Sequence, residues 1–423
     1  MISLRREGRI YAVYVLVVLG LVSVLNYYDR NLITILVEPV KRDLHLTDSD
    51  IGLLSGFGFA LMYSLLGIPM ARLADRYGRA RTLAAVLAIW SLMTTLSGRA
   101  QNYVSMLWAR VGVGVGEAGG LPATHALVAD YFLPVTRGKA LSVIGISGAL
   151  GLSLALGAGG YIADAYGWRT AFYLGGLPGL LLAVLVFFTV REHRIKSEPG
   201  ETVAAPPLRE ALAKLRVRHA FVALCVGMGL ACIGGYGQFA WTPAFLMRTY
   251  HMSTGAVGAY YSAVSGPATL VAVLLGGALN DWLLKRDPRW SLRLIALCFG
   301  ITVPASLVLF LVKNFPLAIG LSVLTTFVGG LWVAPSYALV QSLAGRTMRA
   351  LAAAIFMMIT NIIGLGLGPW VTGLLSDRLS ATLGDKSLGV SLCLVTGTCA
   401  IGCLVFLWGN KTIVADLRAA EAD

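Results

Sequence analysis

Charged residues are scarce in this sequence. Asp, Glu, Lys and Arg make up 13% of the 423 residues, whereas a typical soluble domain carries about 25%. Hydrophobic residues make up 57%, and the mean hydropathy is +0.76. No polar segment is long enough to form a separate soluble domain. The composition therefore predicts a polytopic integral membrane protein.

Motifs for enzymatic chemistry are also missing. The sequence has neither an HExxH zinc-binding pattern nor a GxSxG nucleophile motif. An intramembrane enzyme would need a nucleophile–base pair or metal ligands within its spans. No pair of cysteines has CxxC spacing, and all lie in apolar runs (Cys225, Cys232, Cys298, Cys393, Cys399 and Cys403). We therefore expect no enzyme activity, disulfide, metal or cofactor.

Apolar runs long enough to cross a membrane, which takes about 20 residues in a helix, occur twelve times. Because lipid offers the backbone no hydrogen-bond partner, these runs are predicted to be helices. The first carries Asp29 and Arg30 and lacks a small-x-small cleavage site, so we expect a retained span. The runs lie at about 11–37, 51–73, 82–98, 103–129, 139–162, 168–190, 220–247, 256–284, 292–312, 315–344, 350–374 and 388–408.

A polar stretch separates the first six runs from the last six. We predict an N-terminal six-helix half (1–190), a cytoplasmic linker (191–218) and a C-terminal six-helix half (219–423), with a short amphipathic helix at 207–218. With both termini in the cytoplasm, the inside segments carry about three times as many Lys and Arg residues as the outside loops. This asymmetry explains the net charge of +13 without a nucleic-acid partner.

The two halves repeat each other in sequence. Two six-helix halves related by a pseudo-twofold axis are typical of transporters that rock around a central binding site. The predicted fold is therefore an all-α membrane protein with twelve transmembrane helices in two related halves. The repeated motifs are Gly151–Leu154 and Gly364–Leu367 at an offset of 213, Ala126–Val128 and Ala338–Val340 at 212, and Ala71–Asp75 and Gly277–Asp281 at 206.

Four charged residues lie deep within the predicted spans: Asp29 and Arg30 in the first, Arg110 and Glu117 in the fourth. A charge near the bilayer centre costs about 3 to 10 kcal/mol, so such residues usually face a partner or a water-filled cavity. Arg110 and Glu117 are two helical turns apart and share one helix face. A rise of about 1.5 Å per residue places Asp29 level with Arg110.

These four residues suit the coupling of protons to an anion. A nearby Arg favours an ionised carboxyl group and burial disfavours it, so movement of the Arg changes proton affinity. Arg also presents a planar fork to phosphate or carboxylate. We predict that Asp29 and Glu117 carry protons and that Arg30 and Arg110 hold an ion pair or an anionic substrate. The alternative is a structural ion pair that fixes two helices.

The loop after the second run, Ala71–Arg81, resembles the cytoplasmic loop motif of the major facilitator superfamily. The resemblance implies a conformational latch that includes Asp75, Arg76 and Arg79, with Asp75 facing the positive N-terminal end of the eleventh helix. Asp281, its counterpart in the second half, would face the start of the fifth helix. Such contacts hold one closed state and break in the other.

Three stretches, 26–30, 110–118 and 361–369, resemble the spinster branch of this superfamily, the lysolipid and sphingolipid transporters and their bacterial relatives. The resemblance implies a monomeric, proton-coupled secondary transporter in a bacterial inner membrane, surrounded by membrane lipids. Its substrate would be an amphipathic anionic lipid, of lysophospholipid or sphingoid phosphate type, moved by alternating access. Organic-anion/proton symporters share the first two stretches, so a small organic anion is the alternative substrate.

Further polar and aromatic residues are expected to line the substrate cavity. His125 is predicted to share the face of Glu117 and to extend a proton relay, with a hydrogen bond to a neighbouring helix as the alternative. The glycine-rich seventh helix indicates either a bendable gate or close helix packing. The expected lining residues are Asn26, Tyr28, His125, Tyr236, Gln238, Trp241, Thr360 and Asn361.

Overall fold

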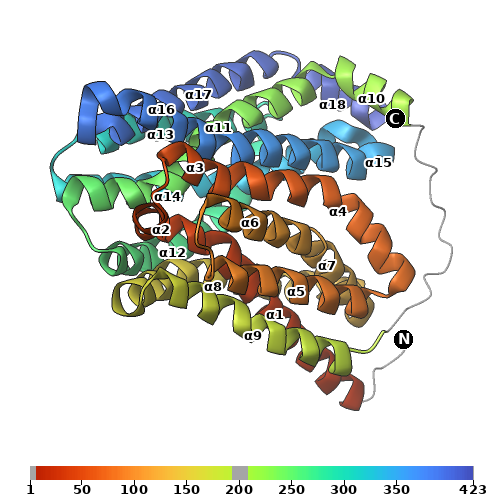
Figure 1. Cartoon of the computed structure of the whole chain (residues 1–423). Coiled ribbons are helices and arrows are strands. Elements are labelled where there is room, and N and C mark those ends of the chain that lie inside the picture. Colours follow the sequence, from red (N-terminus) through yellow and green to blue (C-terminus); the bar gives the residue numbers. More distant parts are fainter. Residues whose placement is uncertain (1–5, 193–207, 423) are drawn as a thin grey trace. The chain divides into compact units, whose positions relative to one another are not determined.

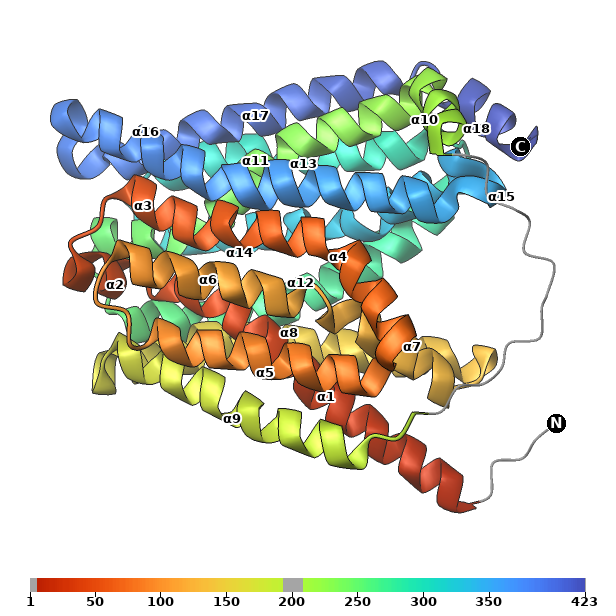
Figure 2. The same cartoon turned by 45° about the vertical axis from the view of Figure 1, so that its right-hand side comes forward.

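The computed structural model describes residues 6–192 and 208–422 (Figure 1, Figure 2). Within these ranges the regular secondary structure is helical, with no strand. The chain divides into two compact units. The first unit comprises Met1–Ser197 and His251–Gly266, and the second comprises Glu198–Tyr250 and Pro267–Asp423.

The first unit is a bundle in which α1 packs along α8 and α5 packs along α9, while α6 lies against both α4 and α5 (Figure 1). The start of α12 also belongs to this unit. Its helices are α1 (Arg6–Ile35), α2 (Val37–Leu44), α3 (Asp48–Gly52), the π-helical η1 (Leu53–Phe57), α4 (Gly58–Tyr77), α5 (Arg79–Ser97), α6 (Tyr103–Glu117), α7 (Gly120–Tyr131), α8 (Pro134–Tyr166) and α9 (Trp168–Thr189).

The second unit is a bundle in which α17 packs along α11 and α13. Apolar side chains of α11, α13, α15 and α17 form its main core. Its helices are α10 (Leu208–Val217), α11 (His219–Tyr250), α12 (Thr254–Leu284), α13 (Trp290–Leu311), α14 (Phe315–Leu331), α15 (Val333–Ile359), the π-helical η2 (Thr360–Leu367), α16 (Gly368–Leu383), the 3-10 turn η3 (Gly384–Lys386), α17 (Ser387–Gly409) and α18 (Ile413–Ala422).

The twelve predicted spans are accounted for by these helices. Ten stretches of the described chain are long and apolar enough on their own to cross a membrane. One of them, Thr347–Gly409, contains two spans, because η3 separates α16 from α17. A further span consists of α6 and α7, which are too short to cross singly with 15 and 12 residues.

The fourth and tenth spans are each broken into two helices, where continuous helices are predicted. α6 ends at Glu117 and α7 begins at Gly120, while α14 and α15 are separated by Trp332. Gly119 and Trp332 are related by the sequence offset of 213, so the break is part of the repeat. Two consecutive glycines, Gly119 and Gly120, explain the first break, because glycine weakens a helix interior.

The outer helix ends repeat as well. His45 and His251 are the non-glycine residues with positive φ among those described, at 53° and 54°, and they are related by the offset of 206. Two residues later, Thr47 and Ser253 each accept a hydrogen bond of 3.1 Å from the backbone N–H three residues on. Both halves therefore start their second helix with the same turn and the same N-terminal cap.

Most of the predicted linker lies outside the described residues. Its end forms α10, which agrees with the amphipathic helix predicted at 207–218. Ala211 and Leu215 are buried on one side of α10, whereas Arg209, Glu210 and Arg216 are exposed on the other.

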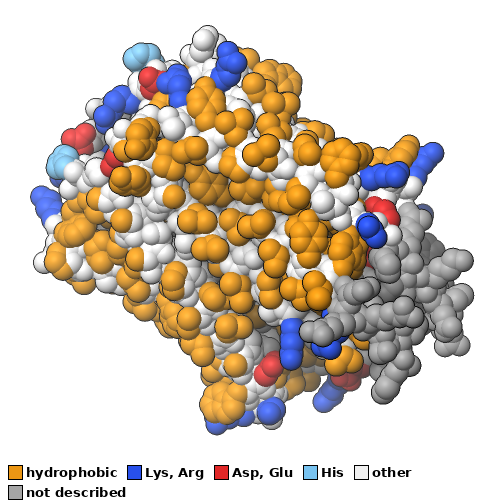
Figure 3. All heavy atoms as spheres, turned by 90° about the horizontal axis from the view of Figure 1, so that it is seen from below, with side chains coloured by type: hydrophobic (Ala, Val, Ile, Leu, Met, Phe, Trp, Pro, Cys, Tyr) orange, Lys and Arg blue, Asp and Glu red, His pale blue; other side chains and the backbone are white. Residues whose placement is uncertain are grey.

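Exposed apolar side chains are abundant on the spans. Figure 3 shows a face whose middle is covered by hydrophobic side chains, with Lys, Arg, Asp and Glu gathered toward its edges. On α9, Leu181 is 76% exposed and Phe188 is 77% exposed. Apolar surface of this extent is unfavourable in water, but acyl chains cover it in a bilayer.

Candidate functional site

An ion pair joins α1 to α6 inside the first unit. Nε and Nη2 of Arg30 both donate to Oε2 of Glu117, at 2.9 and 2.7 Å. The Glu117 side chain is fully buried, whereas that of Arg30 is 21% exposed. The side chain that carries the cation is therefore partly exposed, whereas the carboxylate of Glu117 is sealed.

Aromatic rings surround the same guanidinium group. Cζ of Arg30 lies 4.6 Å from the ring centre of Tyr63, 5.1 Å from that of Phe59 and 5.6 Å from that of Tyr27. The rings of Phe59 and Tyr63 are stacked on one another. A cation over such ring faces is stabilised without being neutralised, so Arg30 keeps its charge beside apolar surface.

Arg110 binds the backbone of α1 and forms no ion pair in the described structure. Its Nη1 donates to the carbonyl oxygen of Asp29 at 3.3 Å, and its Nη2 donates to that of Arg30 at 3.4 Å. The side chain is fully buried. Arg110 therefore clamps α1 to α6 at the level of Asp29, the level at which the sequence places it.

The carboxyl group of Asp29 is not part of this ion pair. Its side chain is fully buried, and neither carboxyl oxygen has a hydrogen-bond partner among the described residues. Trp90 and Thr94 of α5 lie against the carboxyl group. On α9, a Cβ added to Gly175 would lie 3.1 Å from Oδ1 of Asp29. Asp29 and Arg30 are adjacent in sequence, but their side chains contact different residues.

Glycine in α6 brings these helices together. A Cβ on Gly116 would lie 2.7 Å from the backbone nitrogen of Trp90, and one on Gly114 would lie 2.7 Å from the carbonyl oxygen of Phe59. Only glycine permits α6 to approach α4 and α5 this closely. Glu117 follows at the end of α6, directly before the break that starts α7.

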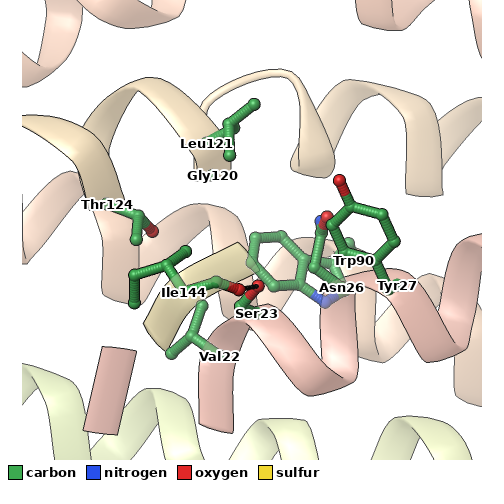
Figure 4. Close-up of a pocket in the computed structure, with 9 residues that line it drawn as sticks. All are labelled: Val22, Ser23, Asn26, Tyr27, Trp90, Gly120, Leu121, Thr124 and Ile144. Atoms are coloured by element: carbon green, nitrogen blue, oxygen red, sulfur yellow. Dashed lines mark hydrogen bonds between the residues drawn. The ribbon is translucent and has the colours of Figure 1, made fainter. Parts of the chain in front are cut away.

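A small pocket lies beside this site in the first unit (Figure 4). In this view the indole of Trp90 lies between Asn26 and Tyr27 on one side and Thr124 and Ile144 on the other. The pocket has room for about one water molecule. It is lined by Val22, Ser23, Asn26, Tyr27, Trp90, Gly120, Leu121, Thr124 and Ile144.

The other predicted residues of the first unit are distributed unevenly. Asn26 lines this pocket and is buried, with Nδ2 unpaired in the described structure. Tyr28 is buried against Gly175 of α9 rather than in open space. His125 lies on α7 and is exposed. The prediction that His125 and Glu117 share one helix face assumed a continuous helix. Glu117 ends α6 and His125 lies on α7, so their spacing in sequence no longer places them on one face.

In the second unit, the predicted residues form neutral contacts. Nε2 of Gln238 donates to Oγ1 of Thr396, and its Oε1 accepts from Oγ of Ser306, both at 2.9 Å. Nε1 of Trp241 donates to the carbonyl oxygen of Pro369 at 2.8 Å. All four polar groups are buried within this unit. Gln238 and Trp241 therefore support helix packing.

Three further predicted residues gather around η2 of the second unit. Thr360 is the first residue of this π-helix, and its hydroxyl donates to the carbonyl oxygens of Phe356 and Met357. Asn361 follows in η2 and is half-buried. The ring of Tyr236 packs where Gly364 has no side chain, with 3.0 Å between its Cδ2 and an added Cβ. Their place in a substrate cavity stays a prediction.

The predicted latch residues bind partly within the first unit. Arg79 donates to Asp130 at 2.5 Å and lies 3.4 Å from Asp75. Arg76 lies over the ring of Tyr77. Asp281 is exposed on α12. The contacts predicted for Asp75 and Asp281 join the two units and stay predictions.

Several residues of the site have no signal in the sequence. Trp90 and Thr94 are neutral residues in an apolar run, and Phe59 and Tyr63 look like ordinary core residues. They belong to the site because Trp90 and Thr94 lie against Asp29, and Phe59 and Tyr63 lie against Arg30. Asp130, which binds Arg79, is the exception, since a carboxylate at the end of a span is visible in the sequence.

Residues 19–369 match the family described as the Major Facilitator Superfamily. The chain belongs to this superfamily. It is similar to an MFS-type efflux pump of Mycolicibacterium smegmatis, with 37% identity over 92% of this chain and 90% of the relative. It is also similar to the probable galactarate/D-glucarate transporter GarP of Escherichia coli K12, with 24% identity over 96% and 95%.

A solved structure extends the likeness. A bacterial homologue of the human lysosomal transporter Spinster, in an inward-facing and unoccupied conformation, matches with a TM-score of 0.85 and 26% identity, over 96% of this chain and 98% of that one. The predicted resemblance to the spinster branch is confirmed, as is the twelve-span, two-half fold of the superfamily. The protein is an integral membrane transporter, and its family implies a small-molecule substrate.

Proposed function

We propose that this protein is a proton-coupled secondary transporter that moves an amphipathic anion by alternating access. The first candidate substrate is a lysophospholipid or a sphingoid phosphate. The single observation that supports it best is the Arg30–Glu117 pair, in which a partly exposed Arg side chain is held by a sealed carboxylate. This arrangement makes one guanidinium group available to two competing anions.

Competition for Arg30 supplies the coupling. While Glu117 is ionised, it occupies Nε and Nη2 of Arg30. Protonation of Glu117 removes its negative charge, and a phosphate or carboxylate then binds the released guanidinium fork. When the proton leaves, Glu117 recovers Arg30 and the anion is displaced. The proton on Glu117 and the anionic group on Arg30 are therefore bound together and released together.

The aromatic rings beside Arg30 favour an amphipathic substrate. Tyr27 and Tyr63 are half-buried, and their ring centres lie 5.6 and 4.6 Å from Cζ of Arg30. A molecule whose charged group lies next to an apolar chain matches a cation flanked by such rings.

A small organic anion is the second candidate. The likeness to a probable galactarate/D-glucarate transporter favours it, since sugar diacids would bind Arg30 through a carboxylate. Both candidates use the same residues and differ in what surrounds the charged group. Placement in a bacterial inner membrane with cytoplasmic termini, a monomeric state and the latch of Asp75 and Asp281 also belong to this proposal.

Purified protein in proteoliposomes tests the proposal. Lysophospholipids, sphingoid phosphates and sugar diacids are offered separately, and proton flux is followed with a pH-sensitive dye. We expect proton flux with the amphipathic anions and none with Glu117→Gln or Asp29→Asn. Asp43→Asn, which breaks an exposed ion pair with Arg169, is the control and should keep wild-type flux. Wild-type, pH-dependent transport in Glu117→Gln refutes the proposal, and flux with sugar diacids alone selects the second candidate.

A further inference from the structure

Unpaired polar atoms gather around Asp29. Both carboxyl oxygens of Asp29, Nε1 of Trp90 and Oγ1 of Thr94 are buried and have no hydrogen-bond partner in the described part of the chain. Trp90 and Thr94 nevertheless face this carboxyl group as hydrogen-bond donors. Their contacts with it fall short of the normal length and angle of a hydrogen bond, although buried polar groups are usually paired.

Charged groups near Asp29 are already engaged elsewhere. Arg110 of α6 uses its guanidinium group for two backbone carbonyl oxygens. Glu117 of α6 is paired with Arg30. The remaining titratable neighbour is Tyr28 of α1. No cation in the described structure forms an ion pair with the carboxyl group of Asp29.

The elements packed on the other side of Asp29 contribute neutral groups. α5 presents Trp90 and Thr94, and α9 presents Gly175. A buried carboxylate without hydrogen bonds or a cation is strongly unfavourable, whereas a neutral carboxylic acid is far better tolerated. The geometry therefore fits the protonated form of Asp29. An ionised Asp29 would need donors, and the two unpaired donors of α5 are already in place.

A small pocket adjoins Trp90 on another side. The pocket in Figure 4 lies against the six-membered ring of Trp90, which packs on Gly120, and it has room for about one water molecule. Nδ2 of Asn26, which lines this pocket, is also buried and unpaired among the described residues. Asn26 further lies beside Glu117, so the pocket adjoins both carboxyl sites.

We propose that Trp90 and Thr94 are positioning residues that hydrogen-bond the ionised form of Asp29 and release it on protonation. The contact between α1 and α5 is tighter when Asp29 is ionised, which links a proton to helix packing inside the first unit. The inference rests on the proposed function in one respect, the exchange of a proton by Asp29.

Variants without the donors test this inference. Trp90→Phe and Thr94→Val remove one donor each. Thr94→Val keeps the volume of the side chain, whereas Trp90→Phe also shortens the ring, an effect that Trp241→Phe reproduces in the second unit. The ionised form of Asp29 loses a hydrogen bond, so the midpoint of the pH dependence of transport should shift upward by about one pH unit. Thr94→Ser keeps the hydroxyl group and should keep the wild-type midpoint, which separates donor loss from a packing defect.

The second unit offers matched controls. Trp241 and Thr396 are as buried as Trp90 and Thr94, but their polar groups are already bonded, to Pro369 and Leu392 respectively. Trp241→Phe and Thr396→Val should therefore leave the midpoint unchanged. An equal shift in these variants would show a general effect of lost polar groups and would overturn the inference.

Infrared difference spectroscopy gives a readout independent of transport. The C=O stretch of a protonated carboxylic acid is followed against pH and assigned to Asp29 by its loss in Asp29→Asn. We expect Trp90→Phe and Thr94→Val to move the titration of this band upward. An unmoved band in both variants overturns the inference. A band that titrates and shifts in a protein whose transport ignores protons supports the inference while the proposed function fails.

Discussion

The two units place different chemistry inside similar bundles. The first unit encloses Asp29, Arg110 and Glu117, all fully buried, and the partly accessible Arg30. The second unit encloses an amide–hydroxyl cluster centred on Gln238, in which the amide oxygen and nitrogen are both bonded. Gly330 stands where the repeat would place a second Glu117. The repeat has therefore preserved the architecture and not the charges.

This difference teaches how to separate structural from functional polar groups. In the second unit, Nε1 of Trp241 has its partner. In the first unit, Asp29 and Trp90 remain unpaired within the described structure. Paired neutral groups hold helices together, whereas unpaired groups beside an ion pair indicate an exchange of partners. The predictions below test this division.

The largest expected effect comes from Arg30. Replacement by Gln leaves Glu117 buried without a cation and removes the proposed anion contact, so transport should fall by roughly 100-fold or more. Replacement by Lys keeps the charge but loses the planar fork and should recover only part of the rate. Transport assays in proteoliposomes measure both. Wild-type rates in Arg30→Gln would move the functional site out of the first unit.

Arg110 should affect stability more than any neutral residue of the second unit. Arg110→Met removes both hydrogen bonds to the backbone of α1 and should lower the free energy of unfolding by about 3 kcal/mol. Reversible unfolding in detergent measures this. If Arg110→Met leaves the free energy of unfolding at the wild-type value, Arg110 does not act as a clamp between α1 and α6.

Gln238 should matter for stability alone. Gln238→Leu leaves the hydroxyl of Ser306 without its acceptor and should lower the free energy of unfolding by about 1–2 kcal/mol. The pH midpoint of transport should stay at the wild-type value, because the amide does not titrate. A shifted midpoint in Gln238→Leu would show that the second unit shares in proton coupling.

The smallest change in stability is expected at the two turns that the halves have in common. His45→Gly and His251→Gly relieve positive φ at two equivalent turns, and each should raise the free energy of unfolding by up to about 1 kcal/mol. His125→Gly is the control, because this residue lies in a regular helix and the change should destabilise by about 1 kcal/mol. Opposite signs at His45 and His251 would contradict the structural repeat of these turns.

The fold was accessible to sequence reasoning because its signals are long. Runs of about 20 apolar residues and a repeated offset survive errors at individual positions. The helix breaks after Glu117 and at Trp332 were not predicted, because both lie inside long apolar runs. The turns with positive φ at His45 and His251 were not predicted either, because histidine indicates positive φ less clearly than glycine does.

The charged residues of the site could be predicted from the sequence, but the ion pair that they form could not. Charge within a span marks Asp29, Arg30, Arg110 and Glu117 from the sequence alone. Helical rise gives their depth but not their rotation, so the choice of Glu117 rather than Asp29 as the partner of Arg30 required the structure.

Competition between a proton and an anion for Arg30 is tested most directly by ligand binding in two buffers of different ionisation enthalpy. Isothermal titration calorimetry of the detergent-purified protein with a lysophospholipid then reports how many protons are taken up on binding. We expect wild-type protein to take up about one proton at neutral pH and Glu117→Gln to take up none. Binding without proton uptake in the wild type, or equal uptake in both proteins, would contradict the account.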